Sequence, residues 1–540
     1  MPPRRVIKVA VIGSGLAGLT AAYLLVKSRS EGSDVEFDVH IFEKSSVLGM
    51  DAESLTVRFP GSSTREETVE IRVDVPMRSI QGGPYPKLMK LYDHLGVALK
   101  LHDYSYSFST PVASISGNNP VTTQMIYNGA SGRDGVGVPS SVFRTRRLSN
   151  PLDLVTILFS VLTWLFSMLA LVLHYGRLYV ISCPTARTPT HLCRETLRAW
   201  AKRTTQQNFV SRLLGWEAFV ADVIVPLFSA VCTTSIEDVW EHPAGEILDY
   251  IWLTFGTHHY VAANGVQDIV SRLTSPVPAG NVHLGAEVYS LASDSSDPGV
   301  ACIKFRTSHT NNTPIQTISG FSHLILATPT FHSARLVESF ASSLPHSSTL
   351  RAPLNKASQL LNTFRTRKVT VITHRDESLL PNHQSDWRDL NLVLDRATPS
   401  AARDKSALAT EHPAPSCVMA THIFPTPSGP ALCQTTNPII SPAQETVLSQ
   451  SILDRSVLTV ESKAARDSFC KPLGDGEITW TRGDLQGLTA TSEERPEAKL
   501  WACGAWAYGG IPLLEGCVGS AEIVVQGILE EEGLKATQMI

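Results

Sequence analysis

The chain has 540 residues, of which 43% are hydrophobic and 18% charged, so packed cores are expected and wholesale disorder is excluded. At roughly 100 to 200 residues per domain, this length suits two to four lobes. The net charge of −4 lacks the basic excess that nucleic-acid binding exploits. Nine cysteines form no CxxC pair and are odd in number, which argues against a zinc site or a disulfide framework and favours an intracellular, reducing compartment.

The N-terminal segment predicts a strand, a glycine-rich turn and a helix. The β-branched run over residues 6–12 is typical of a buried parallel strand, and it leads into the turn 13–18, which reads Gly-Ser-Gly-Leu-Ala-Gly. An apolar helix follows through Leu25, and a second strand over residues 35–42 closes with Glu43. Together these elements predict a dinucleotide-binding unit; the alternative is a tight turn in an ordinary βα unit.

Each part of this unit has a role in binding a dinucleotide. Gly13 allows the tight turn, Gly15 lets the backbone approach a diphosphate, and Gly18 lets the helix pack close to the strand. The helix N-terminus attracts the anionic diphosphate. Glu43 stands where a ribose hydroxyl would find its acceptor. The predicted contacts from this half of the site are Gly13, Ser14, Gly15, Leu16, Ala17, Gly18, Glu43, Lys44 and Gly49.

Further elements follow along the chain. We expect an amphipathic helix over residues 87–96, helices through 195–257, a turn running into a helix over 260–270, strand pieces at 282–284 and 287–289, and an apolar strand over 321–328. The Pro-, Ser- and Thr-rich stretch 395–444 predicts long surface loops around a short strand at 417–424.

One apolar run, Leu154 to Leu173, matches the ~20 residues needed to cross a bilayer. Arginines precede it, and His174 and Arg177 follow, as expected at a membrane interface. A single crossing would place the two halves of the cofactor site on opposite sides of the membrane. We therefore weigh two alternatives, a monotopic or hairpin-like element through which a lipid-like substrate enters, and a helix buried in protein.

The C-terminal segment predicts the second half of the site. Residues 499–504 form a strand that ends in Gly504, and a helix opens near Glu515 and Gly516. A helix N-terminus aimed at a flavin would stabilise the negative charge of its reduced ring. The alternative is an ordinary C-terminal helix of a Rossmann-like domain.

These motifs in this order resemble the amine-oxidase-like flavoproteins, which include monoamine and polyamine oxidases, protoporphyrinogen oxidase and phytoene desaturase. The likeness covers nearly the whole chain and includes segments 13–43, 260–270, 286–288, 324–329 and 504–516. It is closest to the FAD-binding members without an assigned substrate, whose patterns match Pro226 to Ala230, the strand end at His374 and Asp376 with Pro381, and 485–487.

The resemblance implies an α/β fold, with a Rossmann-like FAD-binding domain of three layers (ββα/α) and an inserted α+β substrate domain. The FAD-binding domain would comprise 1–80, 258–345 and 470–540, and the substrate domain 81–257 and 346–469, including the apolar helix 154–173. FAD is the implied cofactor, with Val288 meeting its adenine through the backbone, and with Gly504, Glu515 and Gly516 near the ring. No metal is expected.

The chain departs from this family at two places. It has Gly49-Met50 where Gly-Gly is usual, and it lacks the histidine that close relatives carry before the last helix, where Leu514 stands near Glu515. The acid or base beside the ring is therefore unassigned. Four residues are candidates for the catalytic site. His374 and Asp376 could shuttle a proton, or they could form hydrogen bonds within a loop. Trp506 and Tyr508 could sandwich a substrate, or they could pack in the core.

Three smaller signals have plain interpretations. Cys503 is expected to be a small buried residue rather than a flavin tether, and His258-His259 a loop rather than a metal site. The sequon at 311–313 matters only in a secreted chain.

The sequence thus predicts an FAD-dependent oxidoreductase of the amine-oxidase type, acting on a small or lipid-like hydrophobic substrate, with oxygen or another electron acceptor. The alternatives are a flavin-dependent double-bond isomerase or desaturase, and a non-catalytic flavin-binding or membrane-associated protein. We expect it in the cytoplasm or at a membrane surface.

Overall fold

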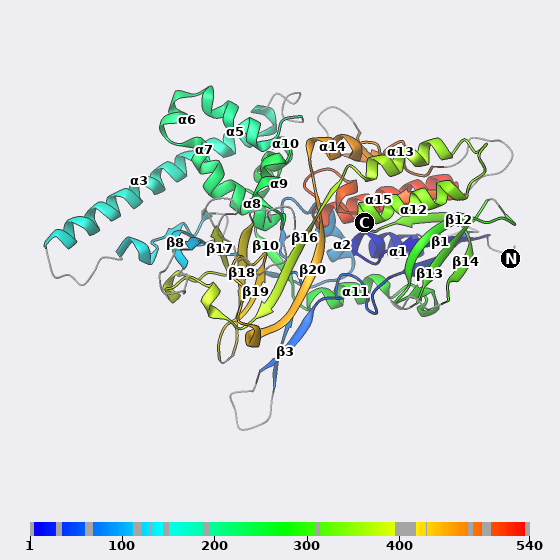
Figure 1. Ribbon diagram of the computed structural model, residues 1–540, viewed down its shortest axis with the longest axis horizontal. Coiled ribbons are helices and arrows are strands. Elements are labelled where there is room, and N and C mark those ends of the chain that lie inside the picture. Colours follow the sequence, from blue (N-terminus) through cyan, green and yellow to red (C-terminus); the bar gives the residue numbers. More distant parts are fainter. Residues whose placement is uncertain are drawn as a thin grey trace, which may run out of the picture.

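The computed structural model describes residues 5–28, 35–59, 68–111, 121–129, 132–143, 151–186, 194–297, 299–307, 314–394, 417–427, 429–473, 479–488 and 498–534. The sequon at 311–313 lies outside these ranges. Figure 1 shows a mixed α/β molecule in which the first and last helices, α1 and α15, lie in the same lobe. A long helix, α3, projects from the opposite end.

A five-stranded parallel sheet forms the centre of the first lobe. Its strand order is β11-β2-β1-β15-β23, and all four neighbouring pairs are parallel. The strands are β1 (Arg5–Ile12), β2 (Val35–Phe42), β11 (Val282–His283), β15 (His323–Leu326) and β23 (Lys499–Ala502). The sheet therefore joins three distant parts of the sequence, as the resemblance implies.

Different layers cover the two faces of this sheet. Because side chains alternate along a strand, Val9 and Val11 face one core while Ala10 and Ile12 face the other. The first face packs against α1 (Leu16–Lys27), α2 (Pro86–His94), α11 (Gly265–Thr274) and α15 (Leu514–Glu531). The second packs against the antiparallel sheet β12 (Glu287–Ser293), β13 (Ala301–Arg306) and β14 (Gln316–Phe321), with α12 (Thr330–Ser343) and α13 (Arg351–Leu361). The three-layer Rossmann-like fold is confirmed.

An eight-stranded sheet forms the second lobe, in the order β20-β16-β19-β18-β17-β7-β8-β9. Its strands are β7 (Tyr106–Pro111), β8 (Val121–Tyr127), β9 (Val136–Gly137), β16 (Arg365–His374), β17 (Leu390–Leu394), β18 (Val418–Phe424), β19 (Leu432–Thr436) and β20 (Val447–Val457). The prediction of surface loops after residue 424 is wrong for β19, whose five residues are all buried. Its polar sequence has no alternation, and its position between two strands buries both faces.

Short helices cover one side of this second sheet. They are α5 (Leu197–Gln206), α6 (Phe209–Leu213), α7 (Trp216–Phe219), the π-helical turn η4 (Val220–Ile224), α8 (Val225–Val231), α9 (Ile236–Glu241) and α10 (Ala244–Thr254). Trp200 and Trp216 lie at the centre of their apolar core. The predicted helical content of 195–257 is confirmed.

Smaller elements complete the described chain. These are the hairpins β3 (Leu55–Phe59) with β4 (Val69–Val73) and β21 (Cys470–Pro472) with β22 (Trp480–Arg482), the sheet of β5 (Ile80–Gln81), β10 (His259–Ala262) and β6 (Leu99–Leu101), and helix α14 (Val460–Arg466).

Helix α3 (Pro151–Ser182) has 32 residues and projects from the molecule (Figure 1). Its C-terminal part is docked, where the ring of His174 stacks on Phe219 at 4.9 Å and Tyr179 on Trp252 at 4.8 Å. An apolar window within Val155–Ser182 has a mean hydropathy of 2.3, and none of it is buried. The alternative of a helix buried in protein is therefore wrong.

Candidate cofactor and substrate site

The turn between β1 and α1 has the backbone geometry that a diphosphate-binding loop requires. Gly13 has a φ of +100°, and a Cβ atom there would lie 2.6 Å from the carbonyl oxygen of Ala327. A Cβ atom on Gly18 would lie 2.1 Å from the carbonyl oxygen of Gly13. A Cβ atom on Gly15, by contrast, would meet nothing within 4 Å. The space beside Gly15, at the positive end of α1, is thus open to an anionic ligand.

Glu43, the predicted ribose acceptor, accepts three hydrogen bonds within the protein. Its Oε2 accepts from the N–H of Ser14 at 3.0 Å and from Ser14 Oγ at 2.6 Å, and its Oε1 accepts from the N–H of Ser45 at 2.9 Å. Ser14 Oγ in turn accepts from the N–H of Gly49 at 2.7 Å. This network fastens the loop after β2 to the glycine turn. Lys44 is exposed. The ligand contacts predicted for this loop stay predictions.

The N-terminus of α15 meets the N-terminus of α1. The backbone N–H groups of Ala17 and Ala505 both point at the sulfur of Cys517 in the first turn of α15. Burial raises the pKa of this thiol to about 11. A Cβ atom on Gly516 would lie 2.5 Å from the carbonyl oxygen of Ala505, so the approach requires glycine. The structure therefore brings the segment from Gly504 to Cys517 to the glycine turn, and two positive helix ends share one place.

Glu515 caps a third helix. Its Oε1 accepts from the N–H of Lys87 and its Oε2 from the N–H of Leu88, both at 3.0 Å, at the start of α2. Burial raises the pKa of this carboxyl to about 7. The observed role of Glu515 is to join α15 to α2, and its contact with a cofactor stays a prediction.

Two arginines that belong to no sequence motif lie near Cys517, where α1 and α15 meet. Arg78 follows β4 and Arg455 lies on β20, and the charge of each reaches Cys517. Burial lowers the pKa of both guanidinium groups, that of Arg455 to about 10, and repulsion from Arg78 contributes to this shift. Arg455 Nε donates to Thr233 Oγ1 at 3.0 Å, whereas Arg78 Nε is enclosed without a hydrogen-bond partner.

Within the described ranges, no carboxylate forms an ion pair with either arginine. The charge of Asp74 reaches Arg78, but both oxygens of Asp74 accept from the N–H of Val266, at 3.1 and 3.2 Å. Two half-buried cations without a paired carboxylate favour an anionic ligand. Sequence reasoning missed Arg455 because β20 carries polar residues throughout its length, and only pairing with β16 brings it here.

A cavity of about 150 Å³ lies between the eight-stranded sheet and helices α8 and α10. Its wall carries four tyrosines and two histidines: Tyr85, Tyr104, Tyr106, Tyr250, His259 and His422. Met77 and Ser79 also line it, whereas Arg78 between them interacts with Cys517. One short segment therefore separates the arginines from the cavity.

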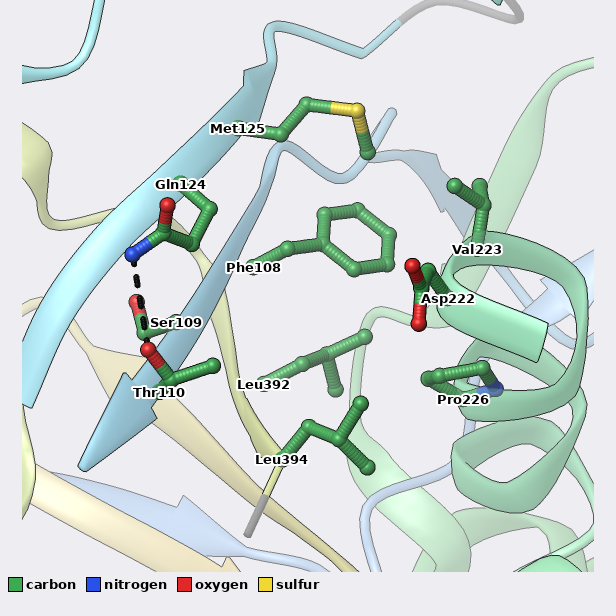
Figure 2. A pocket seen from close by; sticks show the side chains of 10 residues that line it. All are labelled: Phe108, Ser109, Thr110, Gln124, Met125, Asp222, Val223, Pro226, Leu392 and Leu394. Carbon is green, nitrogen blue, oxygen red and sulfur yellow. Dashed lines mark hydrogen bonds between the residues drawn. The ribbon is translucent and has the colours of Figure 1, made fainter. Parts of the chain in front are cut away.

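A second hollow follows along the same strands (Figure 2). Phe108 and Leu392 from the sheet face Val223 and Pro226 from the helices, and the carboxylate of Asp222 points between them. The two hollows adjoin, because Tyr106 and Leu390 line the first while the residues two positions later on β7 and β17 line the second.

The proton-shuttle candidates are bonded within the second lobe. The ring of His374, which is fully buried, contacts Thr435 Oγ1 through Nε2 at 2.7 Å, and its Nδ1 accepts from the N–H of Asp376 at 3.1 Å. The carboxylate of Asp376 accepts from the N–H groups of Ser378 and Ala443. Neither residue lines either hollow. Their catalytic role stays a prediction.

The aromatic candidates are buried beside the last helix. Trp506 packs edge-on against Phe364 and Phe469, and Tyr508 lies against Trp480. Val288 is buried in β12, and Cys503 is fully buried after β23. The predicted burial of Cys503 is confirmed. The roles predicted for Trp506, Tyr508 and Val288 toward a substrate or cofactor stay predictions.

Among the described residues, no group of His, Cys, Asp or Glu could hold a metal ion, and the eight described cysteines are free. His258 and His259 instead contact Asp103, with 2.6 Å between His258 Nδ1 and Asp103 Oδ2.

Comparison with known proteins supports the Rossmann-like lobe, which contains the five-stranded parallel sheet. Residues 11–95 match the sequence model of the NAD(P)-binding Rossmann-like domain. This part of the chain is a Rossmann-like dinucleotide-binding domain. A comparison with curated proteins finds no match.

Solved structures of oxidases are similar to the chain over almost its whole length. Cyclohexylamine oxidase from Brevibacterium oxydans IH-35A is 14% identical with a TM-score of 0.45, covering 98% of this chain and 99% of its own. A putrescine oxidase variant is 10% identical with a TM-score of 0.47, covering 98% and 100%. A proposed protoporphyrinogen oxidase from Exiguobacterium sp. 255-15 is 12% identical with a TM-score of 0.48, covering 97% and 99%. At these identities, chemistry and substrate must be argued from the residues of this chain.

Proposed function

We propose that the protein is an FAD-dependent oxidoreductase of the amine-oxidase type that acts on a small or lipid-like hydrophobic substrate. The observation that carries the proposal is the meeting of the α1 and α15 N-termini at Cys517, beside Arg78 and Arg455, with open space at Gly15. FAD offers two groups that suit such a place, an anionic diphosphate and a ring that becomes negative on reduction. The donor set therefore fits this cofactor.

The chain's own residues divide the work. The turn from Gly13 to Gly18 would hold the diphosphate through backbone N–H groups, and the first turn of α15 with the two arginines would favour negative charge beside it. When bound, the flavin supplies a two-electron acceptor for a C–N, C–C or similar bond, and oxygen or another acceptor restores it. The cavity below Met77 and Ser79 would orient the substrate and exclude water.

Purified protein tests the proposal. We expect the folded protein to release FAD when it is denatured by heat. In the native protein, we expect the bound flavin to bleach when substrate is added under nitrogen. Product formation with a flavin that stays oxidised would instead support a double-bond isomerase. A flavin that no compound from lipid and amine panels bleaches or converts would support a non-catalytic flavin-binding protein. Protein that contains no flavin and fails to bind added FAD would refute the proposal.

We also propose that α3 attaches the protein to a membrane surface. The exposed apolar side chains include Leu158, Phe159, Leu162, Phe166 and Val172, each more than half exposed. The two usual reasons for such a helix, burial in a core and an N-terminal signal, do not fit one that is unburied and lies after residue 150. Contact with lipid would remove these side chains from water.

The topology argues for attachment without crossing. Strand β1, before α3, pairs with β15, and β7 pairs with β17, so segments on both sides of α3 share the same sheets. They must lie on one side of a membrane. The element would therefore dip into one leaflet and return, which suits delivery of a lipid-like substrate.

Flotation with phosphatidylcholine vesicles tests the attachment. We expect the native chain to float with the vesicles, and the variant Leu162→Asp with Phe166→Asp to remain at the bottom of the gradient. Leu473→Asp, directly after β21, serves as the control that adds a carboxylate at a leucine of similar exposure. Equal behaviour of the native chain and the α3 variant would contradict the proposal.

A further inference from the structure

The wall of the proposed substrate cavity is uncharged, whereas two of the similar oxidases are named for amine substrates. Its wall residues include tyrosine, histidine, serine, threonine and glutamine, but the described part of the chain places no Asp, Glu, Lys or Arg side chain on it. Burying a charge without a partner is costly, so a wall without charged side chains favours an uncharged ligand over an ammonium group. The lining therefore bears on the class of substrate.

The two histidines of the wall are neutral. Burial lowers the pKa of both imidazoles, that of His422 to about 4, so neither ring carries charge near pH 7. Each ring meets the ring of Tyr104 edge-on, with centroid separations of 5.9 Å for His259 and 6.1 Å for His422. Nδ1 of His422 is enclosed and has no hydrogen-bond partner in the described chain, whereas Nδ1 of His259 lies 3.7 Å from Asp103 Oδ1. The wall thus presents uncharged donors and acceptors.

The tyrosines of the wall are neutral as well. Burial raises the pKa of the phenols of Tyr85, Tyr104, Tyr106 and Tyr250, so none is ionised at neutral pH. The phenol of Tyr85 lies close to that of Tyr250, and the phenol of Tyr104 lies close to Ser79. Flat aromatic faces held in fixed orientations suit a ring-shaped ligand.

The carboxylates nearest to this wall belong to the layer behind it. Asp103 binds the ring of His258 and the backbone N–H of His259, and Asp389 accepts from the N–H and the hydroxyl of Ser105. On the other side, the charge of Arg78 is directed to Cys517. Charges thus surround the cavity without entering it.

We infer that this cavity binds an uncharged aromatic substrate bearing a hydroxyl or carbonyl group, and that it discriminates against an ammonium group of the same shape. The inference rests on the proposed flavoenzyme function, because it assigns the cavity to the substrate. Hydrogen bonds to the histidine and tyrosine side chains would select the polar group, and the aromatic wall would hold the ring.

Benzyl alcohol and benzylamine test the inference, since they differ little in shape and chiefly in charge. FAD content is measured first by heat release, so that a failed cofactor assignment is recognised separately. The flavin-loaded protein is then titrated with each compound at neutral pH, with the visible spectrum of the bound flavin and calorimetry as readouts. We expect benzyl alcohol to bind at least about tenfold more tightly, because the ammonium group would lose its water without gaining a carboxylate.

A pair of isosteric variants sharpens the test. Gln81 lines the cavity, and its side-chain amide donates one hydrogen bond of 3.3 Å to the carbonyl of Thr254. Gln81→Glu places a carboxylate on the wall and removes this donor, so thermal unfolding first checks that the variant is folded. We expect this variant to shift the preference toward benzylamine by about tenfold. Gln124→Glu, in the second hollow shown in Figure 2, adds the same charge elsewhere and should leave the preference unchanged.

Two results would overturn the inference. One is flavin-loaded native protein that binds benzylamine as tightly as benzyl alcohol or more tightly, which would assign the tyrosines to an aromatic cage for cations. The other is flavin-loaded protein that binds neither compound.

Discussion

Two clusters of buried cations in this molecule are balanced in opposite ways. At the joint between α10 and α14, Glu246 lies 2.8 Å from Lys463 Nζ and 3.3 Å from Arg466 Nη1, so a carboxylate stands between the cations. Beside the glycine turn, Arg78 and Arg455 approach Cys517, and Arg455 has Thr233 as its hydrogen-bonding neighbour.

The difference separates a structural cluster from a binding site. Charges that are paired within the protein join elements that must stay together, and their removal is felt in folding. Cations left without a carboxylate repel each other until an anion arrives, and their removal is felt in binding. The following predictions test this division, beginning with the largest effect.

Glu246→Gln should lower the free energy of unfolding by about 3 kcal/mol, because it removes the carboxylate that Lys463 and Arg466 share and leaves Arg466 with Asp467, at 3.3 Å, as its remaining partner. Burial alone would raise the pKa of Glu246, but Arg466 and Lys463 outweigh it and hold the pKa at about 2, against 4.5 for the free side chain. The stabilisation is therefore present above pH 4.5 and is lost as the pH falls toward 2. Urea unfolding at a series of pH values measures both effects.

Glu241→Gln is the control for this experiment. Glu241 pairs with Arg198 at 3.8 Å on the surface, where both side chains are about half exposed, so the change should cost less than about 1 kcal/mol. Equal losses in the two variants would show that the joint is not the stabilising cluster described here.

Gly15→Val should weaken FAD binding by at least about 100-fold, because the side chain would fill the space that the diphosphate needs. The empty protein should unfold at the same temperature as the native chain, since a Cβ atom at this position meets nothing within 4 Å. Titration with FAD and thermal unfolding without it give the two readouts. Gly280→Val, at an exposed turn with similar free space, should change neither.

Arg455→Met and Arg78→Met should each weaken FAD binding by about tenfold, the scale of one hydrogen bond to a charged group. The cofactor-free variants should be as stable as the native chain or more so, because one of two like charges is removed from a half-buried place. Calorimetric titration and thermal unfolding measure these opposite signs. Unchanged affinity in both variants would remove the arginines from the cofactor site. Arg482→Met, which breaks a surface pair with Glu531, is the matched control.

The sequence predicts one half of this site well because that half is local. Gly13, Gly15 and Gly18 follow a β-branched strand within a few residues, so turn, helix and strand can be inferred from neighbours alone. The projecting helix α3 is likewise predicted by composition, although its exposure is visible only in the structure.

The other half depends on pairing between distant strands. Arg455, on β20, reaches Cys517, and Thr436, on β19, reaches the cavity wall, because β16 pairs with both strands. Neither strand shows a clear alternation of apolar and polar residues. The cavity wall takes Tyr106 from β7 and His422 from β18, which are joined only through β17. No periodic pattern in the chain encodes such a meeting.

Thr233 offers the smallest and most direct test of the division between paired and unpaired cations. It has a φ of +48°, which a β-branched residue tolerates poorly, and its hydroxyl accepts from Arg455 Nε. Thr233→Asn should relieve about 1 kcal/mol of strain and keep an oxygen for Arg455. Thr233→Asp should relieve the same strain and also supply the carboxylate that Arg455 lacks. The Asp variant should therefore be the more stable of the two without cofactor and should bind FAD several-fold more weakly than the Asn variant. Equal FAD affinity in the two variants would mean that the charge of Arg455 is not held in reserve for an anion, and the contrast with Glu246 would lose its functional meaning.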